Sequence, residues 1–370
     1  MLQIFERPGV DGLPDAFLEL PPIVYANEPA WIPEDPEAVR RKFGPQSSWF
    51  EQGQCQLFWV PGKARLATFM RPALQLDGAP AAYFGYWETT GEVDAELFAA
   101  AERWAKARGA KELIGPINFN TFGAYRVRLS AEEGALTFPG EPFNPKSYPK
   151  ILEGLGYTVG PKYVTQLAPA GLASMVRAAR RPLLDKVLAQ GFRIEALTHQ
   201  LWLDNLPQMH ALVDEIFQSN FGYEPLSFEG FAEVCGEKFA RKSCPISSVI
   251  AYDADDAVAG FFLVYPHWGR LVNQIAGANR IASDALSYDE HFPLLRALGP
   301  VDAFSKTVAV SPNHRHKGVM TALTVSMFER GEGLFERWYG ALIGEANFNR
   351  RYGQGLAEDS RWYAVFRKGL

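Results

Sequence analysis

Basic residues gather at one point of the sequence, between an apolar run and a helical pattern. Arg315, His316 and Lys317 stand directly before Gly318, and the apolar run Val308–Val310 ends shortly upstream. The first amides of a helix lack intrahelical partners and lie at the positive end of its dipole, so such a junction can hold a phosphate. Glycine would let the phosphate reach the backbone because it has no Cβ. A solvated basic turn that caps a helix is the alternative, and charge alone leaves both open.

The composition limits the partners that the chain can have. Its 370 residues include 37 basic and 42 acidic side chains, and the net charge is −5. Broad nucleic-acid binding needs a dominant positive field, so no nucleic-acid partner is expected. One local basic pocket is still compatible with this charge. The basic stretch matches neither the GxGxxG dinucleotide fingerprint nor the GxxxxGK(S/T) phosphate loop.

Cysteine usage and the chain's apolar stretches favour a cytoplasmic enzyme or binding protein. Cys55, Cys235 and Cys244 form no CxxC pair. Such a sparse, odd set favours buried free thiols over a disulfide framework or a zinc site, and no metal is expected. The amino terminus lacks a basic region followed by an apolar core, so no secretion signal is expected. No apolar stretch approaches the roughly 20 residues of a membrane span.

The elements that would position the basic loop form an order that occurs twice. A length of 370 residues favours two domains. Each half reads as a strand, two helices, three strands, a helix and a strand, which predicts two copies of one α/β fold with a mixed sheet, of the α+β type. The expected boundaries are a first domain at residues 1–167, a linker helix at 168–192 and a second domain at 193–370.

Alternating and short apolar runs predict the strands, and apolar residues spaced by three and four predict the helices. In the first half we expect a helix interrupted by two prolines at 13–27, strands at 55–60, 64–70, 81–88 and 112–118, and a helix at 94–109. In the second half we expect strands at 200–203, 247–253, 258–266, 303–310, 338–344 and 361–369, helices at 206–222, 227–242 and 319–333, and an irregular stretch at 269–300.

In this order of elements the chain resembles the GCN5-related N-acetyltransferase (GNAT) superfamily. The family signature is a strand, then Gln/Arg-x-x-Gly-x-Gly/Ala, then a helix, and the loop amides hold the pyrophosphate of coenzyme A. The matching residues here are Arg315, His316, Lys317, Gly318, Val319 and Met320. Met320 departs from the pattern, because the family has a small residue there. The resemblance covers about residues 194–370, and the first half is similar to bacterial tandem-domain acetyltransferase-like proteins.

The resemblance also implies roles in catalysis. Acyl transfer to an amine needs a base, a stabilised oxyanion and an acid for the departing thiolate. In the family, strand backbone binds the acyl-pantetheine arm, which assigns Val308 and Val310 to that role. Tyr352 is then the acid and Asn347 a contact to the coenzyme, while a packed tyrosine is the alternative. The base is less defined, since the strand 303–310 carries no carboxylate. Glu345 is the best-placed acidic residue for this role, and the alternatives are a water-mediated base or an acceptor that enters neutral and needs no base. His267 and His291 flank the irregular stretch and are weaker candidates.

The first half is expected to be a degenerate copy that does not bind coenzyme A. Its corresponding junction has Gly91 but no Arg, Lys or Gln, and Glu88, Glu92 and Asp94 surround it. Carboxylates would repel a pyrophosphate by several kcal/mol at a low effective dielectric. This half is expected to supply packing surface and one wall of an acceptor pocket. The candidates for that wall, or equally for loop capping, are Asn118, Asn120, Asn144 and Tyr148.

The expected function is therefore N-acyl transfer from acyl-CoA to an amine of a small molecule, a lipid or a peptide, with the chemistry in the second half. One alternative is a non-catalytic acyl-CoA-binding or scaffold protein. Another is a transferase that uses an acyl carrier protein or an aminoacyl donor. The acceptor, the acyl length and the oligomeric state do not follow from the sequence.

Overall fold

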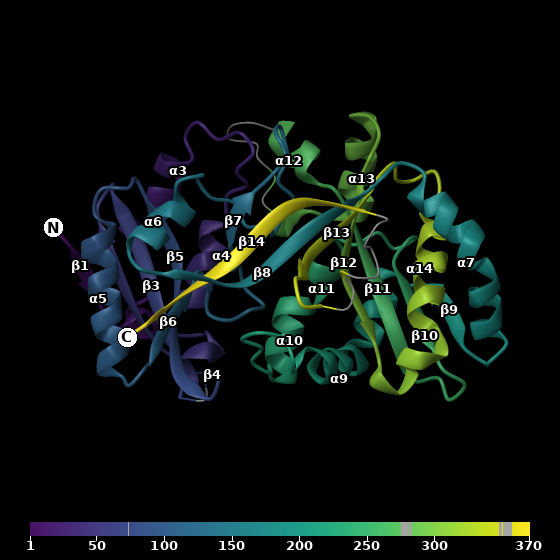
Figure 1. Cartoon of the computed structure of the whole chain (residues 1–370), viewed down its shortest axis with the longest axis horizontal. Coiled ribbons are helices and arrows are strands. Elements are labelled where there is room, and N and C mark those ends of the chain that lie inside the picture. The colour runs from purple at the N-terminus through teal and green to yellow at the C-terminus, as the bar shows by residue number, and fades with distance from the viewer. Residues whose placement is uncertain (73, 275–280, 282, 348–349, 351–356) are drawn as a thin grey trace. The chain divides into compact units, whose positions relative to one another are not determined.

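The chain divides into two units by its internal contacts. The computed structural model describes residues 1–72, 74–274, 281, 283–347, 350 and 357–370. The first unit is Met1–Tyr163 together with Arg361–Leu370, and the second unit is Val164–Ser360. Figure 1 labels the helices and strands of both. The predicted linker range holds α7 (Leu172–Leu188), a helix with Pro182 in its interior, and this helix belongs to the second unit.

The first unit is built on a mixed sheet with the strand order β1-β2-β3-β5-β6-β14, in which β4 pairs with β5 and β7 with β14. Strands β5 and β6 pair parallel, whereas β1 with β2, β2 with β3, β3 with β5, β4 with β5, β6 with β14 and β7 with β14 pair antiparallel. The strands are β1 (Gln3–Phe5), β2 (Gln54–Val60), β3 (Ala64–Met70), β4 (Gln75–Leu76), β5 (Ala79–Thr89), β6 (Glu112–Gly115), β7 (Val127–Ser130) and β14 (Glu358–Gly369).

The last strand of the chain lies in an unexpected place. Residues 361–369 were expected to close the second copy, yet in β14 Phe366 lies opposite Gly115 of β6 in the first unit. A strand's apolar pattern predicts that it will join a sheet, but its partner is decided by which sheet edge is free and complementary. The chain therefore returns to the first unit to complete that sheet.

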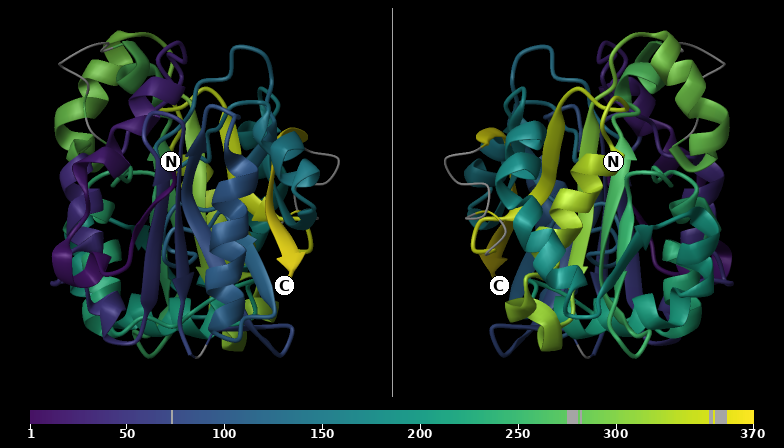
Figure 2. Two further views of the ribbon diagram at one scale, coloured as in Figure 1. Left: turned by 90° about the vertical axis from the view of Figure 1, so that its left-hand side faces the viewer. Right: turned by 90° about the vertical axis from the view of Figure 1, so that its right-hand side faces the viewer.

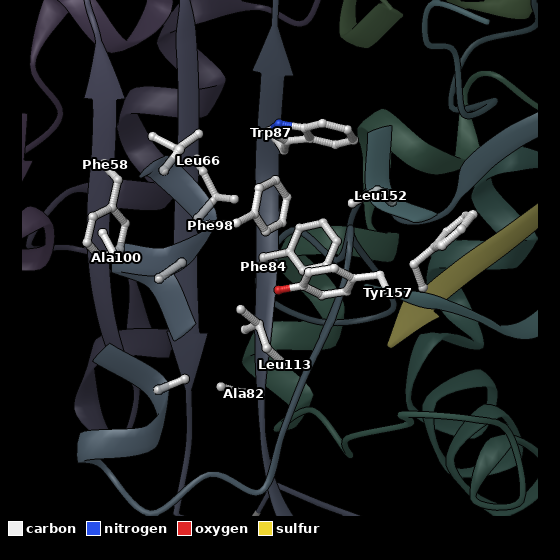
Figure 3. Packing of buried hydrophobic residues seen from close by; sticks show 14 of the residues in the cluster. Phe58, Leu66, Ala82, Phe84, Trp87, Phe98, Ala100, Leu113, Leu152 and Tyr157 are labelled. Carbon is white, nitrogen blue, oxygen red and sulfur yellow. The ribbon is translucent and has the colours of Figure 1, made fainter. Parts of the chain in front are cut away.

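Helices cover both faces of the first sheet. On one face α5 (Asp94–Ala107) and α6 (Tyr148–Gly154) enclose an aromatic core, in which the rings of Phe98 and Tyr157 lie 5.1 and 5.5 Å from Phe84 of β5 (Figure 3). Figure 2 (left) shows α5 along this sheet. On the other face Phe43 lies 6.1 Å from Phe69 of β3. That face is covered by α1 (Pro8–Asp11), α2 (Asp15–Leu18), α3 (Leu20–Val24), α4 (Pro36–Phe43) and the 3₁₀ turn η1 (Ser48–Glu51).

The second unit has the strand order β8-β13-β12-β11-β10-β9. Strands β9 to β12 pair antiparallel, and β12 and β13 pair parallel. The strands are β8 (Thr158–Ala168), which begins in the first unit, β9 (Arg193–Ala196), β10 (Val249–Tyr252), β11 (Val258–Pro266), β12 (Ala303–Val310) and β13 (Trp338–Gly344).

Two helices of the second unit position its central strands. The helix α14 (Val319–Arg330) packs on β10, β11 and α7, and α9 (Leu206–Phe217) packs on β11 and β12 (Figure 2, right). The shorter helices are α8 (His199–Asp204), α10 (Phe228–Cys235), α11 (Glu237–Ala240), α12 (Gly269–Gln274) and α13 (Tyr288–Ala297), with 3₁₀ turns η3 (Ser283–Ala285) and η4 (Pro312–Lys317).

Two predicted elements of the second unit are wrong. Residues 200–203 form part of helix α8 rather than a strand, because the side chain of Thr198 caps the helix at Leu201 N and the indole of Trp202 is buried. The strand instead lies just upstream, in β9. The stretch 269–300 is also more regular than expected, since Ser287 caps α13 within it. The predicted buried thiols are confirmed: Cys55, Cys235 and Cys244 are free and buried.

Within the described ranges, no helix has both the length and the hydropathy that crossing a membrane requires.

Candidate functional site

The second unit's sheet opens between its two parallel strands. Ala303–Ser305 of β12 lie in register with Trp338–Gly340 of β13, and the register ends there in the part of the chain that the structure describes. The remainder of β12 stays paired with β11 alone, up to Val310 opposite Gly260. Among the described residues, one edge of β12 therefore has no neighbouring strand along its last residues.

The free edge of β12 carries the backbone groups of Val308 and Val310. The amide of Ser311 donates to Ala259 O on the β11 side at 2.9 Å. Residues of a strand direct their N–H and C=O groups to alternate sides, so Val308 and Val310 direct theirs away from β11. An extended ligand with amide groups can pair with such an edge as an additional strand would.

A β-bulge marks the point where β12 and β13 separate. Thr307 lies opposite Leu263 and Ser305 opposite Val264, so Lys306 is an extra residue inserted between these two pairs. Bulges often lie beside active sites, where they redirect a side chain. Burial raises the pKa of the Cys235 thiol to about 12, although the nearby charge of Lys306 lowers it. The sequence contains no signal for this bulge, and Lys306 was not among the predicted site residues.

The basic loop follows directly after the free edge. Arg315, His316 and Lys317 are exposed at the end of η4. Gly318 then adopts a left-handed conformation with φ of 85°, and α14 starts at the next residue. A Cβ at Gly318 would lie 3.1 Å from Val187 of α7. The backbone conformation and this close approach together require glycine.

A histidine of the same loop fastens it to the turn between β10 and β11. The Nε2 atom of His314 lies 3.2 Å from Asp253 Oδ2, and its ring meets Phe192 edge-on at 5.3 Å between centroids. Burial alone would raise the pKa of Asp253, because it disfavours the charged carboxylate. The amides of Ala257 and Asp255 and the His314 side chain nevertheless hold the pKa of this carboxyl below its ordinary value. The sequence showed His314 as part of a basic cluster but gave no sign of its partner.

We predict that His314→Phe, which keeps an aromatic ring and removes the bond to Asp253, loosens the loop. Loss of a partly buried hydrogen bond to a charged group amounts to about 1.5 kcal/mol, which corresponds to roughly tenfold faster amide exchange. Hydrogen exchange at residues 315–318 measures the change. Asp253→Asn tests the same contact from its other end. It keeps an oxygen that accepts from the amides of Asp255 and Ala257, and it should accelerate exchange at residues 315–318 as well. Unchanged exchange in both variants would show that the pair does not hold the loop.

The corresponding opening in the first unit is filled by the unit's own chain. Strands β5 and β6 are in register only over Ala81–Tyr83. Beyond that point Ile117 N donates to Phe84 O at 2.7 Å, and Asn118 Oδ1 accepts from Tyr86 N at 2.8 Å. Asn118 thus occupies this strand edge.

The start of α5 in the first unit is likewise satisfied from within. Asp94 Oδ1 accepts from Trp87 Nε1 at 3.0 Å, and Oδ2 accepts from Thr89 Oγ1 at 2.9 Å. Thr89 Oγ1 in turn accepts from the amide of Gly91 at 2.8 Å. Burial raises the pKa of Asp94, and these hydrogen bonds oppose that shift. A carboxylate therefore stands at the helix start, where an anion would otherwise bind.

Comparison with known proteins identifies this architecture. No family model matches the chain. Protein YghO of Escherichia coli (strain K12) is 23% identical over 277 residues, which are 71% of this chain and 68% of that protein. A solved tandem GNAT protein from the clavulanic acid biosynthesis pathway superposes on 100% of this chain and 98% of its own, with a TM-score of 0.52 and 14% identity.

The chain has a tandem GNAT fold. A conserved protein of unknown function from Enterococcus faecalis V583, described as a probable N-acyltransferase, superposes on 100% of this chain and 72% of its own, with a TM-score of 0.50 and 10% identity. These likenesses confirm the predicted fold class, a mixed-sheet tandem GNAT fold. At identities this low, structural similarity establishes the fold only. The reaction has to be inferred from the residues of the site.

The predicted catalytic residues of the second GNAT unit lie at and beyond the end of β13. Glu345 and Asn347 are exposed in the turn after this strand, where Asn347 N donates to Gly344 O at 2.8 Å. Tyr352 lies outside the described residues. The structure therefore places Glu345 and Asn347 beside the strand that separates from β12, and their roles stay predictions.

The other candidates from the sequence make local structural contacts. His267 is buried beside Phe304, and its Nδ1 accepts from Gly269 N at 3.2 Å. The Nδ1 of His291 accepts from Ser287 N at 3.2 Å. Asn144 binds backbone of the first unit, accepting from Arg128 N at 2.7 Å. Asn120 does the same, accepting from Phe122 N at 3.0 Å. These contacts support the loop-capping interpretation of the two asparagines.

Proposed function

We propose that the second GNAT unit is an acyltransferase that moves an acyl group from acyl-CoA to an amine of a small molecule, a lipid or a peptide. The observation that carries this proposal is the free edge of β12, which leads straight into a basic loop and a helix start. A donor with an amide-containing arm and a pyrophosphate would match both features at once. The first unit has neither feature available, because Asn118 and Asp94 occupy the corresponding places.

In the proposed complex the pyrophosphate is held by amides at the start of α14, from Gly318, Val319 and Met320, and by the charges of Arg315 and Lys317 with His316 beside them. The pantetheine arm pairs with the free backbone groups of Val308 and Val310. Met320 is half-buried in the first turn of α14 and limits how closely the phosphate approaches.

The proposed chemistry begins when the acceptor amine loses a proton, with Glu345 or a water next to it as the base. The amine attacks the thioester carbonyl, and a backbone amide of β12 stabilises the oxyanion. The carbon–sulfur bond then breaks, and Tyr352 supplies the proton that the departing thiolate takes up. Asn347 contacts the coenzyme. No metal is part of this proposal.

The first test is the affinity for coenzyme A of Arg315→Glu, measured by calorimetry on the whole protein. Replacing a phosphate-binding cation by an anion removes a charge-assisted interaction, so we predict that affinity falls roughly tenfold or more. Arg296→Glu is the matched control: this exposed arginine lies on α13, and its replacement changes the net charge equally. Equal affinity of parent and Arg315→Glu would refute the pyrophosphate assignment.

Turnover separates the proposed enzyme from the alternatives. Release of free thiol from a panel of acyl-CoA donors with amine acceptors is expected in the parent and is expected to be slowed in Tyr352→Phe. Coenzyme A binding without turnover for any pair would indicate a non-catalytic acyl-CoA-binding protein. Turnover only with acyl carrier protein or aminoacyl donors would indicate a transferase that uses one of these donors instead of acyl-CoA.

A further inference from the structure

A carboxyl group in the first unit is set in place by a β-bulge. Arg65 of β3 lies opposite Glu88 of β5, and Ala67 lies opposite Gly85, so Tyr86 and Trp87 together face a single residue of β3. Tyr86 adopts a positive φ of 49°, which is rare for a residue with a large side chain. Strained backbone of this kind persists where the surroundings fix it, often beside a binding site.

Two buried tyrosines hold one oxygen of this carboxyl and leave the other open. Glu88 Oε2 accepts from the hydroxyls of Tyr25 and Tyr148, each at 2.8 Å. Both tyrosines are 3% exposed, so their geometry is firmly set. For Glu88 Oε1 there is no donor in the described part of the first unit. Glu88 itself is half-buried, and the two hydroxyls hold its carboxyl in a defined position.

Glu88 forms no ion pair within the described residues: no Lys, Arg or His nitrogen lies within 4.0 Å of its carboxyl. Arg65, its cross-strand neighbour, acts on it only from a longer distance. The guanidinium of Arg65 instead donates to Phe17 O at 2.7 Å and lies over the Phe17 ring. A half-buried carboxylate without a cation in contact with it is unfavourable, and a cation bound at Oε1 would reduce that penalty.

The groups that surround Glu88 explain its protonation. Burial raises its pKa from 4.5 to about 7, while the charge of Arg65 and the hydroxyls of Tyr25 and Tyr148 lower it and the charge of Glu34 raises it. The negative charges of Glu34 and of ionised Glu88 favour a positive ligand, and the charge of Arg65 opposes it.

Aromatic rings provide the remaining surface. Tyr25 stacks on Trp31 with 4.8 Å between centroids, and Phe143 lies 5.8 Å from Tyr25. On the other side Trp87 lies 4.3 Å from Tyr148. Ring faces attract cations and also accept the apolar part of an amine.

We propose that Glu88, with the rings of Tyr25 and Trp31, forms a binding site in the first unit for the protonated amine of a small molecule. The free Oε1 accepts an N–H of the ammonium group, and the rings contact its carbon chain. This site goes beyond the proposed function, because it lies in the other unit and its test involves no acyl donor.

Calorimetry of the whole protein with n-butylamine at pH 7 tests the site, and tetramethylammonium, which has no N–H, is the comparison probe. We expect n-butylamine to bind at least tenfold more tightly than tetramethylammonium. Binding should also release about half a proton, because Glu88 is half protonated near this pH and a bound cation ionises it. Repeating the titration in buffers of different ionisation enthalpy measures the released proton.

Two variants make the assignment specific. Glu88→Gln is expected to weaken n-butylamine binding at least tenfold and to abolish the proton release. Glu102→Gln is the matched control, because Glu102 also accepts from a tyrosine hydroxyl, that of Tyr157, but is already paired with Lys368 at 2.8 Å. This control should bind as the parent does. If Glu88→Gln does not fold, Tyr25→Phe replaces it, with weaker binding expected.

The proposal is overturned if the parent does not bind n-butylamine, if tetramethylammonium binds equally well, or if Glu88→Gln binds like Glu102→Gln. None of these results bears on coenzyme A binding by the second unit, so this site and the proposed function succeed or fail separately.

Discussion

Replacing Arg361 by methionine is expected to lower the free energy of unfolding of the first unit by about 3–5 kcal/mol, because it leaves a buried carboxylate without its cation. Arg361 is 1% exposed and its partner Glu141 0% exposed, and Arg361 Nη1 lies 2.7 Å from Glu141 Oε2. Glu132 accepts from the other side of the same guanidinium at 2.8 Å. Tyr363 donates to Glu141 Oε1 at 2.6 Å, but a hydroxyl does not neutralise the charge.

The pKa of Arg361 agrees with this arrangement. Burial alone would lower it, yet Glu141 and Glu132 outweigh burial and raise the pKa well above its ordinary value. Arg361 is therefore charged whenever the unit is folded. Because it lies on β14, the network also fastens the last strand of the chain to the segment that contains Glu132 and Glu141.

Native-state hydrogen exchange of the amides in β6 and β14 measures the stability of the first unit. Arg367→Met is the matched control on the same strand: its side chain is 30% exposed and pairs with Glu112, so a loss below about 1 kcal/mol is expected. The double variant Arg361→Met with Glu141→Gln should recover part of the loss, because the buried charge is removed. Equal losses for Arg361→Met and Arg367→Met would contradict the prediction.

Glu88→Gln is expected to make the first unit more stable than the parent at pH 8, and the advantage should shrink as the pH falls. Burial raises the folded-state pKa of Glu88 from 4.5 to about 7. The folded state then binds the proton more tightly than the unfolded state, so the stability that this proton contributes is complete below pH 4.5. It is lost as the pH rises through about 7. The loss amounts to about 3 kcal/mol, and glutamine does not undergo it.

Urea denaturation of both proteins from pH 4.5 to pH 8 measures this difference. The difference in free energy of unfolding between Glu88→Gln and the parent should increase by about 3 kcal/mol toward pH 8. Glu102→Gln is the control, and its effect at pH 8 should be destabilising. It removes the ion-pair partner of Lys368 and should lower the free energy of unfolding by about 1 kcal/mol or less. A gap for Glu88→Gln that does not change with pH would show that Glu88 titrates in the folded state as it does when unfolded.

Local patterns in the sequence predicted most elements of the fold. The short apolar runs at 258–266 and 303–310 became β11 and β12, since a strand between two layers buries both of its faces. Gly109, the last residue of the helix predicted at 94–109, has a φ of 87° two residues after the end of α5. The error at 200–203 arose because four apolar and polar residues fit a strand and a helix equally well.

The basic loop illustrates how far such patterns reach. Its residue types and its place between a strand and a helix are local features, so the position of Gly318 at the start of α14 could be predicted. The hydrogen bond between His314 and Asp253 could not, because it joins residues that are 61 positions apart. Nor could the separation of β12 from β13, since it depends on where two strands stop pairing.

Local patterns in the sequence were sufficient for most of the elements and for the position of the basic loop, because these depend on near neighbours in the chain or on the spacing of apolar residues. The GNAT fold of the two copies was implied by the resemblance of the chain to that superfamily. Tertiary structure decided that β14 completes the first sheet, that Asn118 fills the opening there, and that Tyr25 and Tyr148 meet Glu88 across 63 and 60 residues. Such contacts form only when whole elements pack together, because the free energy that selects them is summed over many distant residues.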